Sequence, residues 1–162
     1  MIERHEDKDV ITVDLEAVFG RVVMLSAYQA EKSIEGDNPV VLVMEAVDTP
    51  LFLAHLDPVV ADIKPLLISR MDGQGMTVTN TEIIIELQKD VISKEGLEII
   101  DRALPDALTS GVLAGYQSGA RGYERVAEHN GQRYREALKQ VSHAGTFRTR
   151  PKDKIRIRQR YF

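Results

Sequence analysis

The chain has 162 residues, of which 43% are hydrophobic and 28% are charged, and its net charge is -4 at pH 7. This length and composition predict one folded domain that can bury a core without metals or disulfides. Because the sequence contains no cysteine, disulfides, thiol catalysis, zinc-thiolate sites and iron-sulfur clusters are excluded.

The charge is divided unevenly along the chain. Residues 1–120 contain 9 Lys and Arg against 21 Asp and Glu, whereas residues 121–162 contain 12 against 4. Residues 145–162 alone hold 7 basic residues and 1 acidic residue. A division of this kind favours self-association or binding to a polyanion, and it says little about the fold.

The first nine residues lack the apolar stretch of a secretory signal. The longest apolar run, residues 40–44, is far shorter than the roughly 20 residues that a membrane-spanning helix needs. We therefore expect a soluble protein that is made in a cytoplasm and has no membrane partner.

The N-terminal part is expected to contain an arm, a strand and two helices. Residues 1–10 are polar and predict a flexible arm, and the alternation in residues 11–15 predicts a short strand. A broad apolar face in residues 16–32 predicts a first helix. The Asp-Asn-Pro sequence that follows is typical of a helix start and predicts a second helix over residues 39–47.

The central part is expected to contain a third helix and a strand. An Asp-Thr-Pro start signal and helical apolar spacing predict a helix over residues 51–71, kinked or split near Pro58 and Pro65. After a glycine-rich turn at residues 72–75, the Thr, Val and Ile content of residues 76–87 predicts a strand. One strand cannot satisfy its own backbone, so it must pair with the first strand, with the C-terminal arm or with another subunit.

Two long helices are expected in the C-terminal part. Ser93 is a suitable cap for a helix that runs to about Gln117, with a kink or break near Pro105. The spacing of Gly111 and Gly115 predicts a close helix crossing. A last helix is expected over residues 121–141, where apolar side chains recur at helical spacing.

The sequence shows none of the patterns that mark a catalytic or cofactor site. The four histidines form no His-x-x-x-His pair, and no serine lies in a Gly-x-Ser-x-Gly or Ser-x-x-Lys motif. No phosphate-binding glycine motif is present. Carboxylates at Asp7, Asp9 and Asp14, or at Asp57 and Asp62, could pair for acid-base work, but in an acidic domain we interpret them as a solvated face. We predict a protein that is not an enzyme and that has no cofactor or metal.

The C-terminal arm, residues 144–162, is the most unusual segment. Pro151 excludes a continuing helix, and Ile155 and Ile157 alternate with basic residues in the period of a strand, so the arm is predicted to be extended. The predicted contact residues of the arm are Phe147, Arg148, Arg150, Lys152, Lys154, Ile155, Arg156, Ile157, Arg158, Arg160, Tyr161 and Phe162.

Three uses of this arm remain open. It could add to a neighbouring protein as a strand, with isoleucines in pockets and cations on an acidic surface. It could bind nucleic-acid phosphates, with its aromatic residues stacked on bases. It could also be a disordered solubilising tail. We favour docking on a neighbouring copy or another protein, because the rest of the chain is acidic and a nucleic-acid-binding protein is more often basic in its body as well.

A second contact is predicted on the isoleucine-rich strand. Its residues are Glu82, Ile83, Ile84, Ile85, Glu86 and Leu87. Such a strand needs hydrogen-bond partners, and a heterologous ring contact can supply them from the next copy.

The segments follow one another as a strand ITVDL, a helix LEAVFGRVVMLSAYQAEK with Tyr28, a proline-containing helix ending in IKPLLISRM, an isoleucine-rich strand, two long helices and a basic-aromatic end. This order resembles small virion-associated proteins encoded in the structural modules of phages and prophages of gut bacteria. The resemblance implies a head-to-tail connector, neck ring or tail-adaptor subunit with no catalytic residue, many copies of which surround the channel through which DNA passes. The ending of this chain is longer than the Tyr-Tyr-Arg-Lys type of such proteins.

We therefore predict a helix-dominant α+β fold with four or five helices and a small sheet. One domain, residues 11–143, is expected between the arms at residues 1–10 and 144–162. The predicted function is a structural assembly subunit found in the virion, and in the host cytoplasm during assembly. Its expected partners are copies of itself, portal, connector or tail proteins, and DNA in the channel. The alternative is a nucleic-acid-binding accessory protein that uses the same basic arm.

Overall fold

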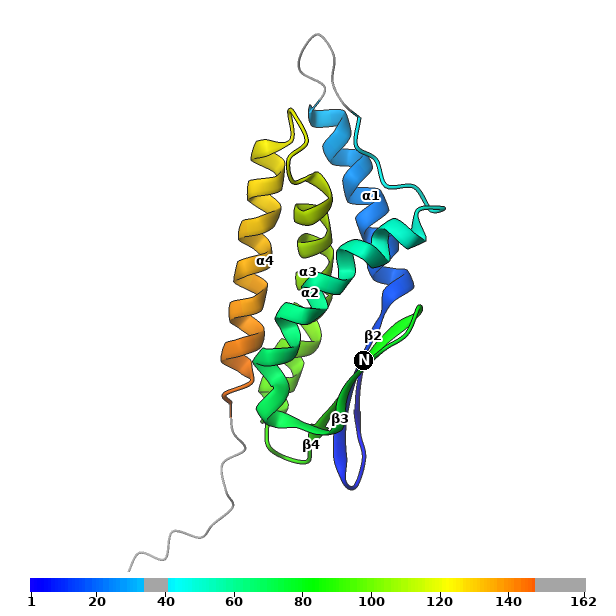
Figure 1. Ribbon diagram of the computed structural model, residues 1–162. Helices are drawn as coiled ribbons and strands as arrows, with labels where there is room; N and C mark the ends of the chain where they lie inside the picture. Colours follow the sequence, from blue (N-terminus) through cyan, green and yellow to red (C-terminus); the bar gives the residue numbers. More distant parts are fainter. Residues whose placement is uncertain (34–40, 148–162) are drawn as a thin grey trace, which may run out of the picture.

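The structure is a computed structural model and describes residues 1–33 and 41–147. Within these residues, α-helices lie beside a small antiparallel sheet, so the predicted helix-dominant α+β fold is confirmed (Figure 1). The strands are β1 (Ile2–Arg4), β2 (Lys8–Asp14), β3 (Met71–Val78) and β4 (Glu82–Gln88). The helices are α1 (Leu15–Ser33), α2 (Thr49–Leu67), α3 (Lys94–Gln117) and α4 (Glu124–Ala144), with a 3₁₀ turn over Ile68–Arg70.

Two hairpins build the four-stranded sheet, whose strand order is β1-β2-β4-β3. Each pair of neighbouring strands is antiparallel, and the two hairpins join where β2 meets β4. At this junction Ile11 lies opposite Ile85, and Val13 lies opposite Ile83. Because these four side chains are buried and share one face, they fix the register and turn that face toward the helices.

The two faces of the sheet differ. The buried face packs on α2 and α3, where Ile63 and Leu108 belong to the same apolar core. On the other face, the ammonium group of Lys8 donates to the carboxylate of Glu86 and links β2 to β4. This hydrogen bond raises the pKa of Lys8 above its usual value. A cross-strand ion pair on a solvated face adds little stability, so the buried face holds the sheet in place.

The central helix of the bundle is α3, which packs against α1, α2 and α4. It begins as predicted, since the hydroxyl of Ser93 accepts a hydrogen bond from the backbone N–H of Gly96 at 3.1 Å. Near its other end, buried amides tie three helices together. The side chain of Gln117 donates to Gln29 of α1 at 2.7 Å, and Asn130 of α4 donates to Gln117 at 2.8 Å. These paired amides fix how the helix ends meet.

Gly111 lets α2, α3 and α4 approach one another closely, which confirms the predicted crossing. A Cβ atom at this position would lie 2.7 Å from Val59 of α2 and 3.0 Å from the ring of Tyr134 of α4. At the same crossing the Tyr134 hydroxyl donates to Asp62 at 2.9 Å. Burial, together with this hydrogen bond, raises the pKa of Tyr134 well above its usual value.

The predicted flexible arm at residues 1–10 is wrong. Residues Ile2–Arg4 form a strand, and β2 begins at Lys8 rather than at residue 11. Ile2 lies opposite Ile11 across the hairpin and packs against the core. The polar composition of this segment is explained by its position at the sheet edge, where most side chains face water.

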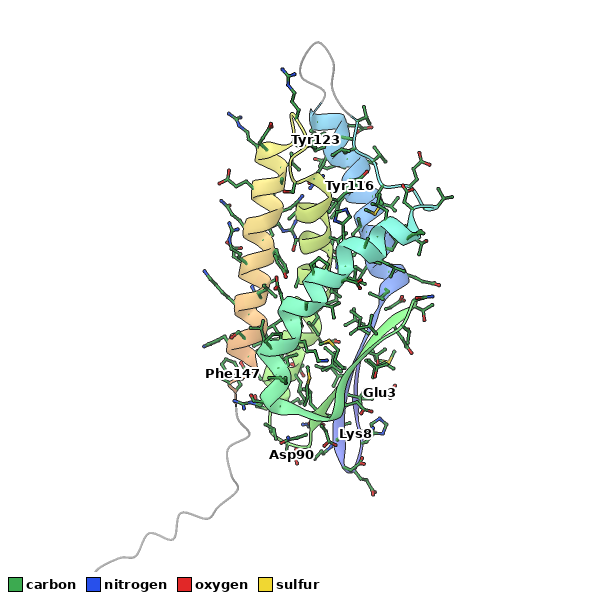
Figure 2. The ribbon with its side chains drawn as sticks, viewed as in Figure 1. Glu3, Lys8, Asp90, Tyr116, Tyr123 and Phe147 are labelled. Carbon is green, nitrogen blue, oxygen red and sulfur yellow. The ribbon has the colours of Figure 1, made fainter. Side chains whose placement is uncertain are left out.

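The predicted helix over residues 39–47 is also wrong for the part that the structure describes, residues 41–47, which contains no helix. Two long-range hydrogen bonds hold this segment along the bundle. The Tyr123 hydroxyl accepts from the backbone N–H of Leu42, and the Ser26 hydroxyl accepts from that of Met44, both at 3.0 Å. These tertiary contacts override the local start signal (Figure 2 labels Tyr123).

The predicted strand over residues 76–87 is two strands, with a turn between Val78 and Glu82. The Thr79 hydroxyl accepts from the backbone N–H of Glu82 at 3.0 Å, which closes this turn. The predicted turn at residues 72–75 instead lies inside β3 as an irregularity in the pairing, with both glycines at positive φ.

The prolines do not divide the helices. α2 is one helix that contains Pro58 and Pro65 and bends along its length, as the kinked alternative predicted (Figure 1). α3 likewise continues through Pro105.

Candidate interaction surface

A groove of about 500 Å³ opens between α1, the start of α2 and the β3–β4 turn. Its lining from α1 is Leu15, Glu16, Phe19, Gly20 and Val23. The other walls come from Ala46, Thr49, Phe52, Asn80 and Thr81. Glu16 is the one charged residue in this lining, so the groove is an apolar depression with an acidic group at its edge.

Local contacts fix the three walls of the groove. Asp14 caps α1 by accepting from the backbone N–H groups of Glu16 and Ala17. The first residue of α1, Leu15, donates its backbone N–H to the carbonyl of Thr81 at 2.8 Å, which ties the helix to the β3–β4 turn. The rings of Phe19 and Phe52, 4.8 Å apart, join α1 to α2. These walls belong to the rigid packing of the domain.

Gly20 of α1 lies in the lining of the groove at an open position. A Cβ atom at this position would meet no atom within 4 Å. Glycine is a poor residue for a helix interior, and no local packing requires it here. A larger side chain at this position therefore has room to enter the groove.

Large apolar side chains are also exposed on α1, on residues 41–47 and at the start of α2, the same part of the fold that supplies most of the groove. Met24 is 64% exposed and follows Val23, Val47 is 79% exposed and follows Ala46, and Leu51 is exposed at the start of α2. Tyr28 and Val41 are also exposed. We call these five residues the apolar surface. Between Arg21 and Glu31, α1 has no charged side chain. Exposed apolar patches of this kind mark interaction sites.

The groove has an acidic border. Residues 14–23, 45–52 and 78–82, the three segments that surround it, contain five acidic residues and one basic residue, Arg21. Arg21 is paired with Asp106 of α3 at 2.8 Å. Of the acidic residues, Glu16 lines the groove itself. Glu45, Asp48 and Glu82 lie on the same segments outside the lining, and Asp14 lines a separate depression with Arg21. The field at the groove therefore favours a cationic ligand.

Of the predicted arm contacts, Phe147 lies within the described residues, and it is packed on the domain at the end of α4 (Figure 2). Its carbonyl accepts from the backbone N–H of Ser93 at 2.7 Å, and its ring meets His143 edge-on at 4.8 Å. The remaining predicted contacts, Arg148 to Phe162, lie outside the described residues. The predicted arm boundary at residue 144 is therefore too early, because residues 144–147 belong to the packed end of α4.

The predicted strand contact is only partly possible. β4 is an inner strand whose two edges pair with β2 and β3, so the predicted pairing with the first strand is found and no further strand can pair with β4. Ile83, Ile85 and Leu87 are buried in the core. A contact through the half-exposed side chains of Glu82, Ile84 and Glu86 stays a prediction.

Among residues 1–33 and 41–147, no three His, Asp or Glu side chains are grouped so that they could hold a metal ion. No helix in this part of the chain combines the length and apolar character needed to cross a membrane. No family model, curated protein or solved structure matches the chain. The groove, its acidic border and the apolar surface were not identified from the sequence. The available signal was the charge-free stretch of α1 with Gly20 before it.

Proposed function

We propose that this protein is a non-enzymatic structural subunit that assembles with copies of itself. The observation that carries this proposal is the apolar surface on α1, residues 41–48 and the start of α2. Burial of apolar area against a partner is favourable by roughly 25 cal/mol per Å². Covering Met24 and Val47, which are 64% and 79% exposed, therefore lowers the free energy of the protein.

The charge distribution supports a second copy as the partner. Residues 1–147 hold 14 basic and 24 acidic residues, whereas residues 148–162 hold 7 basic residues and 1 acidic residue. Two identical chains can thus attract each other when the basic end of one meets the acidic body of the next. A contact between two different surfaces of the same chain is heterologous, and it forms a ring when the rotation closes.

The specific assembly that we propose is a phage head-to-tail connector, neck ring or tail adaptor. Its ground is the resemblance in segment order and in residues 11–32. In this role the copies contact portal, connector or tail proteins around the channel for DNA, in the virion and, before that, in the host cytoplasm.

The mass of the full-length protein in solution tests the self-association, measured over a concentration series by sedimentation or light scattering. We expect a multimer of defined copy number, alone or on a portal or tail protein. A strict monomer under both conditions would overturn the proposal. If that monomer bound duplex DNA with an affinity that fell steeply with salt, the nucleic-acid-binding alternative would replace it.

A matched pair of variants locates the contact. Met24→Glu places a charge on the apolar surface and is expected to weaken association at least about tenfold, because a buried Met side chain contributes roughly 1.5–3 kcal/mol. Ile68→Glu is the control, since Ile68 is 61% exposed, against 64% for Met24, and lies at the other end of α2 from the groove. Equal weakening by both variants would contradict this location.

A further inference from the structure

The groove and the C-terminal segment have complementary chemistry. The groove offers an apolar floor around Phe19 and Phe52 and the acidic border described above. Residues 148–162 contain seven cations and the apolar residues Ile155, Ile157, Tyr161 and Phe162. Arg guanidinium groups pair with carboxylates through two parallel hydrogen bonds, so an Arg-rich segment suits an acidic border.

The size of the groove and the length of the segment agree with such a contact. A volume of about 500 Å³ lies within the range of roughly 300–1,000 Å³ that is typical of small-ligand pockets, so the groove can hold a few side chains of the segment. Fifteen residues can span at most about 50 Å. The segment starts from a fixed point, because the carbonyl of Phe147 is hydrogen-bonded to Ser93 at the start of α3. It is therefore long enough to reach a neighbouring chain.

Binding of the segment to a neighbouring copy would cover more of the exposed apolar side chains than binding to its own chain. If the segment folded back onto its own chain, it would fill the groove but leave Tyr28 and Val41 in water. If it reached a second copy, it would fill the groove and also hold two domains together, so that their remaining apolar surfaces could meet. Linked contacts of this kind strengthen each other through their effective concentration.

We propose that the groove between α1, the start of α2 and the β3–β4 turn is the receptor for residues 148–162 of a second copy of this chain. This inference rests on the proposed self-assembly and names the site that carries it. Apolar side chains of the donated segment contact Phe19, Gly20 and Val23, and its arginines pair with the acidic border.

Engineered cysteines test the contact directly, because the chain contains no cysteine of its own. Two full-length variants with different tags, Asn80→Cys at the groove and Ile157→Cys in the segment, are mixed under mild oxidation. A disulfide requires Cα atoms about 4.4–6.8 Å apart, so it forms between chains only where the segment reaches the groove. We expect more mixed dimer from this pair than from Ile157→Cys mixed with Gln140→Cys, an exposed control position on α4.

Measuring the mass of the same samples distinguishes a failure of the groove as receptor from a failure of the proposed self-assembly. A multimer with equal crosslinking at Asn80→Cys and Gln140→Cys overturns the groove as receptor but leaves the self-assembly standing. A monomer overturns both. A chain carrying Asn80→Cys and Ile157→Cys together should crosslink into multimers. If it closes internally as a monomer, a second copy is not the donor.

A second pair of variants tests the groove without altering the core: one blocks the groove and the other is its control. Gly20→Lys adds a cationic side chain where a Cβ atom meets nothing within 4 Å, and it is expected to reduce crosslinking roughly tenfold or more by like-charge repulsion. Gly131→Lys on α4 is the matched control, since a Cβ atom there meets only the end of Arg135, at 3.6 Å. Both variants should keep the melting temperature of the unmodified protein within a few degrees. Unchanged crosslinking in folded Gly20→Lys would contradict the proposal.

Discussion

Asp9 is a buried charge that joins two parts of the sheet. Its side chain is 1% exposed, and it accepts hydrogen bonds from the guanidinium of Arg4 at 3.1 Å and from the ammonium of Lys89 at 3.3 Å. The backbone N–H of Asp90 also donates to it, at 3.3 Å. A buried carboxylate is stable only when it is paired in this way. Asp9 therefore holds the β1–β2 hairpin against the loop after β4, in which Asp90 is labelled in Figure 2.

We expect Asp9→Asn to lower the free energy of unfolding by about 1.5–3 kcal/mol, because hydrogen bonds to charged groups are lost while the partner cations remain partly exposed. Urea denaturation measures this difference. The control is Glu98→Gln, which breaks the exposed pair of Lys94 and Glu98 at 3.7 Å and should change the stability by less than about 0.5 kcal/mol. If the two variants were equally stable, Asp9 would not stabilise the contact between the β1–β2 hairpin and the loop after β4.

This role of Asp9 could not be predicted from the sequence. We interpreted Asp9, with Asp7 and Asp14, as part of a solvated acidic face. That interpretation holds for Asp7, which is exposed, but not for Asp9. The difference depends on the pairing of β1 with β2, which the polar composition of residues 1–10 concealed. A single inward-facing charge in a polar segment leaves no periodic signal.

At the scale of elements, local chemistry predicted the long helices, but it failed where contacts from distant residues decide the conformation of a segment. The long helices follow from apolar periodicity and from the Ser93 cap, and each was predicted within a few residues. The segment 41–47 follows a helix-like start signal, but its backbone N–H groups donate to the hydroxyls of Ser26 and Tyr123, and it forms no helix. The turn at Thr79 was missed because threonine usually favours strands, whereas here its hydroxyl closes a turn by accepting a hydrogen bond from the backbone.

The close crossing at Gly111 predicts a reversal of the usual effect of replacing glycine in a helix. Gly111→Ala should lower the free energy of unfolding by about 1–3 kcal/mol, since the new methyl group would lie 2.7 Å from Val59. At Gly131 there is room for a methyl group, so Gly131→Ala should raise the free energy of unfolding by roughly 0.5–1 kcal/mol. Denaturation curves of the two variants measure this. Stabilisation by both would show that α2, α3 and α4 do not meet as closely as described.

At the scale of the whole molecule, the groove is the feature that the sequence could not predict. Its walls come from three segments separated by tens of residues, which are joined by the hydrogen bond of Leu15 to Thr81 and by the contact of Phe19 with Phe52. The asymmetry of charge, by contrast, is visible in the sequence. The sequence thus predicts that the basic segment has an acidic partner, and the fold supplies a candidate place for it.

Salt is expected to have opposite effects on the intact chain and on a chain that ends at Phe147. In the proposed assembly the basic end of one intact chain is attracted to the acidic body of the next. Raising NaCl from about 0.05 M to about 0.5 M should therefore lower the average mass of the intact chain, as screening shortens the range of charge interactions. The shorter chain has a net charge of -10, from 14 basic and 24 acidic residues, and its copies repel. Salt weakens that repulsion and should leave its mass unchanged or raise it through the apolar surface. Light scattering over a salt series measures both, and circular dichroism confirms equal helix content. A fall in mass with salt in both chains would place the electrostatic attraction within residues 1–147 and remove the basic segment from the contact.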